Sequence, residues 1–373
     1  MPTPSAAKFT RDGRTCGMIT ITHLPWGCGR LRMSRGEMFR DLNYRVLTLV
    51  LIGLAIIGFL LTGRPSNTHG VDHHVNVITI ERMRHGADYY EAMDSGLREA
   101  YGPSETLRAF RMPTLFLVWS RIPNDWLIWV LYLATAAGTG LLSTRLTRFP
   151  LIGVVVALIL MITGRIREGG QWMEQYTTVE LWAAGMVVVV AVLWQKGAYR
   201  SAALAALAGA LMRETAAGLL VGGLIGAWTI RTRRPVWSAA LLAFGAAYII
   251  HASQVSQWLV PRGQGSETPL LGTGGITDVL AMMGFGLPIP LLAGPLLWSF
   301  ATHQAWRRRH WPALVHLMLP WCGLLLHRPY WGILTMPLVV TFGADGLGDA
   351  ISKLRRTRSA EVSGAPRGEQ PEA

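Results

Sequence analysis

The stretch SAALAALAGALMRETAAGLLVGGLIGAWTI, residues 201–230, decides the fold class, because two apolar runs enclose a single charged pair, Arg213-Glu214. Basic residues bound the stretch at 196–200 and 231–234, which leaves roughly 12–15 residues for each limb of a hairpin. A helix of that length is about 18–23 Å long, short of a ~30 Å hydrocarbon core. The sequence therefore predicts a short helical hairpin whose apex lies within the outer leaflet, with Arg213 and Glu214 lining a cavity open to the outside.

The composition supports a membrane setting for this hairpin. Of the 373 residues, 51% are hydrophobic and only 15% are charged, whereas soluble domains are about one quarter charged. The polar residues are concentrated at the two ends of the chain and in a few loops. This pattern excludes a disordered chain, a coiled coil and a secreted disulfide scaffold. The net charge of +13 then reports topology and does not imply a nucleic-acid partner.

The fold class predicted is an all-α polytopic membrane protein with about ten transmembrane helices and a helical first outer loop. The segments that are long and apolar enough to span or nearly span a bilayer lie near 45–62, 126–143, 149–164, 179–194, 201–212, 215–230, 236–252, 287–305, 312–327 and 330–347.

Positive charges predict the orientation. With the N-terminus inside, most of the 35 Lys and Arg residues fall on the inner side, as the positive-inside rule requires. The chain then divides into a basic cytoplasmic segment (1–44), a multi-span domain (45–350) and a disordered cytoplasmic tail (351–373). We expect an N-in, C-in protein of a bacterial inner membrane.

Two outer loops are substantial, 63–125 and 253–286. Apolar residues recur at helical spacing from about Val77 to Ala100, which predicts one amphipathic helix at the membrane surface. The run HGVDHH, 69–74, fits a polar surface loop better than a metal site, because no second cluster completes a coordination shell. No nucleotide-binding, zinc-protease or serine-hydrolase motif is present.

Apart from the intramembrane pair, two groups of residues have the right chemistry for a site. In the first outer loop, Asp88 precedes Tyr89 and Tyr90, so a carboxylate able to deprotonate a hydroxyl adjoins aromatic rings able to pack against a sugar. Arg111 follows where the chain re-enters the membrane. The turn HRPYW, 327–331, places His327, Arg328 and Tyr330 at headgroup depth. Each of these also has a plainer interpretation. Arg213-Glu214 would be an internal ion pair, Asp88 a solvated acid, and Arg328 a residue that reaches lipid phosphate.

Together these features resemble the GT-C superfamily of polytopic glycosyltransferases, which use polyprenyl-phosphate-linked sugars. The resemblance covers residues 40–350 and rests on the order of four elements: GADYY at 86–90, RMPTL at 111–115, Arg213-Glu214 and RPY at 328–330. The chain departs from many members in having no Asp-Glu pair in the first loop and no folded C-terminal outer domain.

The resemblance implies that a sugar moves from a polyprenyl phosphate to the hydroxyl of a glycan, lipid or protein acceptor on the outer face, with inversion. Asp88 would be the general base, and Arg213, Arg328 and Arg111 would hold the departing phosphate. Glu214 would orient Arg213 or the acceptor, and Tyr89, Tyr90, His327 and Tyr330 would contact substrate. No organic cofactor is implied, and the resemblance leaves metal dependence open.

Three other functions remain consistent with the residues. A transporter or lipid flippase explains the intramembrane charges, although it explains neither the acidic first loop nor the lack of internal repeats. An envelope polysaccharide polymerase or ligase would place its largest loop later in the chain. A non-catalytic scaffold is the least informative alternative.

Overall fold

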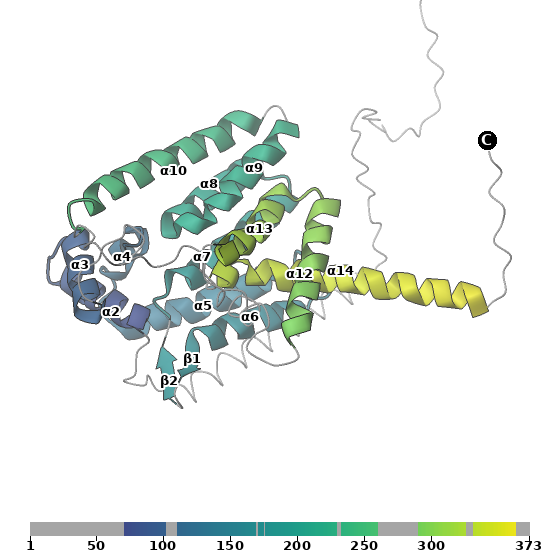
Figure 1. Cartoon of the computed structure of the whole chain (residues 1–373), viewed down its shortest axis with the longest axis horizontal. Helices are drawn as coiled ribbons and strands as arrows, with labels where there is room; N and C mark the ends of the chain where they lie inside the picture. Colours follow the sequence, from purple (N-terminus) through teal and green to yellow (C-terminus); the bar gives the residue numbers. More distant parts are fainter. Residues whose placement is uncertain are drawn as a thin grey trace, which may run out of the picture. The chain divides into compact units, whose positions relative to one another are not determined.

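The computed structural model describes residues 71–101, 110–168, 171–174, 176–229, 233–259, 290–325 and 331–362. Within these ranges the chain is helical apart from one β-hairpin (Figure 1). The helices are α2 (Val71–Arg84), α3 (Tyr89–Tyr101), α4 (Thr114–Trp119), α5 (Asp125–Ser143), α6 (Ile152–Thr163), α7 (Val179–Gln195), α8 (Tyr199–Met212), α9 (Ala217–Thr229), α10 (Arg234–Val255), α12 (Pro290–Arg307), α13 (Trp311–Leu325) and α14 (Trp331–Val362).

Every predicted apolar segment from 126 onward coincides with one of these helices. A long apolar run forms a helix where its backbone N–H and C=O groups must find hydrogen-bond partners within the segment. Two of the described helices, α5 and α10, are long and apolar enough to cross a membrane. The first predicted segment, 45–62, and most of the second outer loop, 260–286, lie outside the described residues.

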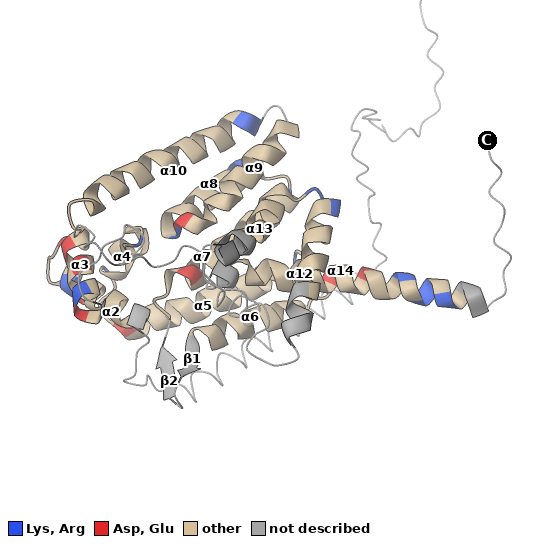
Figure 2. Cartoon of the chain, viewed as in Figure 1, with Lys and Arg blue, Asp and Glu red and all other residues tan. Residues whose placement is uncertain are grey.

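In Figure 2 the long apolar helices are mostly uncharged, whereas α2 and α3 carry both basic and acidic residues. The turn between α5 and α6, with Arg145 and Arg148, and the turn between α12 and α13, with Arg307 and Arg308, lie together beside α14. We call this the basic end of the helices. The opposite end carries α2, α3 and α4, and we call it the hairpin end.

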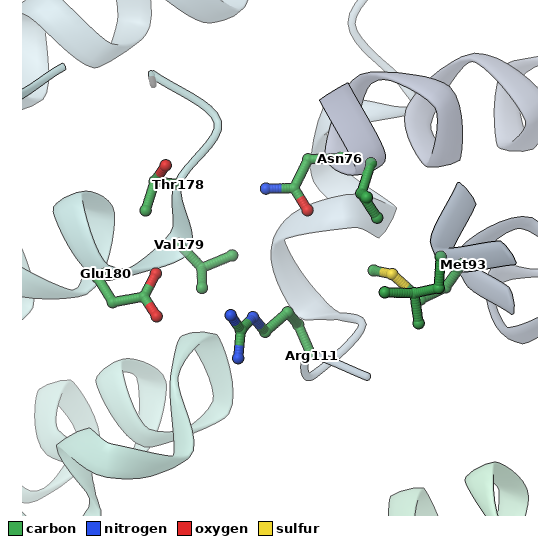
Figure 3. Close-up of a pocket in the computed structure, with 8 residues that line it drawn as sticks. Asn76, Met93, Arg111, Thr178, Val179 and Glu180 are labelled. Carbon is green, nitrogen blue, oxygen red and sulfur yellow. The ribbon is translucent and has the colours of Figure 1, made fainter. Parts of the chain in front are cut away.

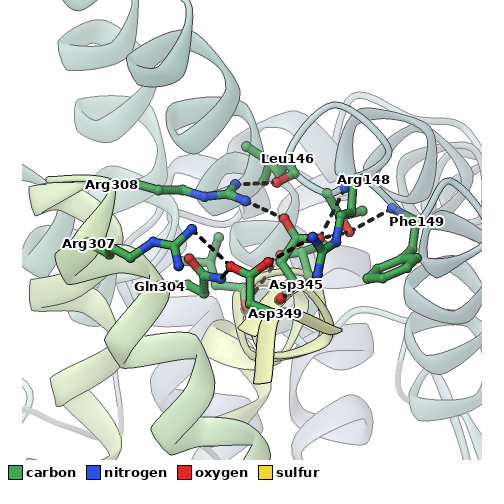
Figure 4. Close-up of polar contacts among 11 residues, drawn as sticks. Leu146, Arg148, Phe149, Gln304, Arg307, Arg308, Asp345 and Asp349 are labelled. Atoms are coloured by element: carbon green, nitrogen blue, oxygen red, sulfur yellow. Dashed lines mark hydrogen bonds and ion pairs between the residues drawn. The ribbon is translucent and has the colours of Figure 1, made fainter. Parts of the chain in front are cut away.

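A network of ion pairs holds the basic end together (Figure 4). Asp345 of α14 accepts hydrogen bonds from the Thr147 hydroxyl at 2.6 Å and the Arg148 backbone N–H at 3.1 Å, and it pairs with Arg308. Arg308 also donates to the carbonyl of Leu146 at 2.8 Å. Two turns and the helix α14, which are far apart in the sequence, are therefore fixed side by side.

The hairpin end corrects one prediction. The stretch 77–100 is not a single helix at a membrane surface, because the chain reverses at Gly86, whose φ of +95° favours glycine. The helices α2 and α3 instead pack against each other, and the apolar side chains Ile80, Met93 and Leu97 are buried in protein.

Two further features were not predicted in full. The described residues are helical, as predicted, except that strands β1 (Arg165–Glu168) and β2 (Gln171–Glu174) form one antiparallel hairpin. The sequence between them, Gly169-Gly170, is a hairpin signal that the helical pattern obscured. The tail is also not disordered from 351, because α14 continues to Val362. Its last turns contain Lys353, Arg355, Arg356 and Arg358, helix formers whose charge suits a helix C-terminus.

Candidate functional site

The apex of the predicted short hairpin is the centre of the candidate site. α8 has 14 residues and α9 has 13, so each limb is about 20 Å long, as the sequence predicted. Between them, Arg213 leaves helical geometry with φ −147° and ψ 116°, and a 3₁₀ turn follows at Glu214–Ala216. This break turns the Arg213 side chain inward, where only 1% of it is exposed.

Two carboxylates surround the buried guanidinium of Arg213. Its Nη2 lies 2.9 Å from Oε1 of Glu180, in the first turn of α7, and its Nη1 lies 2.6 Å from Oε1 of Glu214. The side chain of Glu180 is 4% exposed and that of Glu214 is 27% exposed. A buried charge without such partners would cost several kcal/mol. Glu180 did not stand out in the sequence, although it is the one acid at the start of the apolar segment 179–194.

Arg111 brings a second positive charge to the same place. It lies in the short connection before α4, and its guanidinium points toward the carboxylate of Glu180 (Figure 3). Glu180 interacts electrostatically with both Arg213 and Arg111. Within the part of the chain that the structure describes, the two arginines Arg111 and Arg213 face the two carboxylates of Glu180 and Glu214, so their positive charges are paired.

A small cavity lies between Arg111 and Glu180. Its volume is about 20 Å³, which is room for about one water molecule. Its lining combines polar and apolar side chains: Val75, Asn76, Met93, Leu97, Arg111, Thr178, Val179 and Glu180. A sugar ring does not fit in this cavity.

Tyr89 and Tyr90 both contact this cluster, and their predicted role in contacting substrate stays a prediction. The Tyr89 hydroxyl donates to the backbone carbonyl of Arg111, and its ring meets that of Tyr90 edge-on at 5.0 Å. Burial raises the pKa of Tyr89 well above its usual value, and the negative charge of Glu214 raises this pKa further. Tyr89 is therefore a neutral hydrogen-bond donor at any physiological pH.

His251 is a second residue that sequence reasoning missed. It lies near the end of α10, and its Nδ1 is 3.2 Å from the Tyr90 hydroxyl. The same imidazole hydrogen-bonds to the backbone of Phe110 and interacts electrostatically with Glu214. His251 thus joins α10 to α3 and to the connection that carries Arg111. Its position at the outer end of a predicted apolar segment was the available signal.

Asp88 lies at the edge of the cluster. It is exposed, and one of its carboxylate oxygens accepts the backbone N–H of Tyr90 at 2.9 Å, which caps the start of α3. Burial raises the pKa of Tyr90 above its usual value, and the negative charge of Asp88 raises it further. Its role as general base remains a prediction. Glu81, His85 and Ala87, which precede Asp88 in the sequence, help to line an open pocket of about 510 Å³.

The remaining predicted residues have different outcomes. His327, Arg328 and Tyr330 lie outside the described residues, so their place in the site remains a prediction. The run 69–74 is not a surface loop where it is described, because α2 begins at Val71. Nδ1 of His73 is buried 2.6 Å from the Thr177 hydroxyl. No group of three or more metal-ligating side chains occurs among the described residues.

Comparison with known proteins adds no relative. No family model matches the chain, and neither a curated protein nor a solved structure was found to match it.

Proposed function

We propose that the protein is a ten-span, N-in and C-in membrane glycosyltransferase that moves a sugar from a polyprenyl phosphate to an acceptor hydroxyl at the hairpin end. The observation that carries the proposal is the convergence of Tyr89, Tyr90, Arg111, Arg213 and Glu214 on one cluster. These residues come from three separate stretches of the chain, and all five are among those that the resemblance to GT-C enzymes assigns to substrate binding.

The exposed surface of α10 supports the membrane setting. Only 17% of its most apolar 18-residue stretch is buried within the structure, and Leu242 and Ile249 are 74% and 70% exposed. A core helix of a soluble protein would bury such residues against its neighbours. Lipid tails are a suitable environment for this face.

The reaction requires two tasks of the protein's own residues. The acceptor oxygen attacks the anomeric carbon, its proton passes to a carboxylate, and the bond from that carbon to the phosphate oxygen breaks. We assign the proton transfer to Asp88, which follows in the sequence Ala87, a lining residue of the open pocket that we propose for the acceptor. Arg111 and Arg213, with Arg328, would stabilise the phosphate that leaves, and Glu214 would orient Arg213.

The direct test uses purified full-length protein in detergent or nanodiscs with a set of polyprenyl-phosphate sugars. Release of free polyprenyl phosphate together with a glycosylated acceptor supports the transferase. Binding of the lipid with no release in the presence of acceptors refutes it and favours a carrier of anionic lipid.

Two variants identify the base. Asp88→Asn should lower turnover by about 10²–10⁴-fold, the usual contribution of general base catalysis, while expression stays normal. Glu214→Gln is the matched comparison, because Glu214 is the partly exposed carboxylate nearest the buried arginine. A large loss in Glu214→Gln with near-normal turnover in Asp88→Asn would transfer the role of base to Glu214.

A further inference from the structure

The two carboxylates that pair with Arg213 differ in their freedom to move. Glu214 is 27% exposed and follows the break in the hairpin, so it can turn toward solvent. Glu180 is 4% exposed and lies within the first turn of α7, where neighbouring residues 179–184 are nearly all buried. Glu180 therefore cannot leave Arg213 without a rearrangement of α7.

The charge balance limits what the cluster can bind. Among the described residues, Glu180 and Glu214 already face Arg111 and Arg213, so an entering phosphate adds one or two negative charges beside two carboxylates. Two like charges about 4 Å apart repel by about 4 kcal/mol at an effective dielectric constant near 20. The arginines must therefore exchange one carboxylate partner for the phosphate, and Glu214 is the partner that can be exchanged.

We propose that Glu180 is a positioning residue, the fixed counter-ion that holds Arg213 in place, faces Arg111, and keeps phosphate affinity low enough for release of the lipid product. This inference rests on the proposed function. Glu180 holds the guanidinium of Arg213 while Glu214 turns away, so Arg213 keeps its direction through the reaction cycle. Its remaining negative charge opposes the phosphate and prevents the product from becoming a tight inhibitor.

The test measures binding of a short-chain polyprenyl monophosphate to the full-length protein in detergent by isothermal titration calorimetry. Glu180→Gln keeps the size of the side chain and removes its charge, so we expect binding at least about tenfold tighter than in the parent. Glu91→Gln is the matched control, because it removes a charge from an exposed position on α3. Its affinity should equal that of the parent.

Kinetics separate positioning from a merely structural role. In Glu180→Gln, KM for the lipid donor and kcat should fall together, because the donor binds more tightly and the lipid product leaves more slowly. A residue that only supports folding would lower the amount of active enzyme, and therefore the apparent kcat, with KM unchanged.

Three outcomes overturn the inference. A folded Glu180→Gln protein that binds the lipid phosphate as the parent does, or less tightly, refutes it while leaving the proposed function intact. If Glu180→Gln does not fold, Glu180→Asp retains the charge but withdraws the carboxylate from Arg213, and unchanged affinity in that variant refutes it equally. A parent protein that binds no polyprenyl phosphate refutes the proposed function and this inference with it.

Discussion

The basic end offers a measurable test of how the turns are held together. Asp345 is 1% exposed and accepts hydrogen bonds from Thr147 and from the backbone of Arg148, besides pairing with Arg308. In Asp345→Asn the amide oxygen still accepts the two neutral hydrogen bonds, but its NH₂ group opposes the guanidinium of Arg308. A hydrogen bond to a charged group contributes about 1.5–3 kcal/mol. Because Arg308 is 33% exposed and water can solvate it, we expect a loss of about 2 kcal/mol of unfolding free energy.

Thermal unfolding of the detergent-solubilised protein, followed by the fluorescence of its 15 tryptophans, measures this loss. For a chain of 373 residues, a change of 2 kcal/mol corresponds to a decrease in Tm of roughly 2–4 °C. Asp349→Asn is the control, since Asp349 is 23% exposed and its partners Arg148 and Arg307 are about half exposed. Solvent-screened pairs of this kind contribute less than about 1 kcal/mol. Equal Tm values for the two variants, or a larger decrease for Asp349→Asn, would refute the reasoning.

Two further predictions concern packing and pH. A Cβ at Gly223 of α9 would meet the ring of Trp237 at 2.0 Å, so Gly223→Ala should lower Tm strongly. A Cβ at Gly245 would meet nothing within 4 Å, so Gly245→Ala should leave Tm nearly unchanged. Similar Tm values for the two variants would contradict the close approach of α9 and α10. Because burial raises the pKa of Tyr89 in the folded protein, its stabilising contribution is complete below pH 10, the usual tyrosine pKa, and declines as the pH rises above it. Phenylalanine has no hydroxyl to ionise, so in Tyr89→Phe the urea midpoints measured between pH 8 and 11 should decline less steeply than in the parent. Identical slopes would contradict the raised pKa of Tyr89.

The amino-acid sequence by itself determined the described helices and the short hairpin around Arg213. Runs of apolar residues bounded by charges predicted the α-helices that the structure describes from 126 onward, and the spacing of basic residues predicted the short limbs around Arg213. Local signals suffice for such features, because helix formation and turn spacing depend on neighbours within a few residues. They did not suffice for 77–100, where the apolar period continued through the reversal at Gly86.

Only the tertiary structure decided which charges meet. Glu180 precedes Arg213 by 33 residues, and Tyr90 precedes its partner His251 by 161, so no periodicity in the sequence links them. Packing of α7 against α8, and the contact of α10 with α3, brings these side chains together. A buried guanidinium must have counter-ions, and the sequence shows that requirement at Arg213. The choice of Glu180 to meet it depends on which helix ends lie side by side, which is a property of the packed fold.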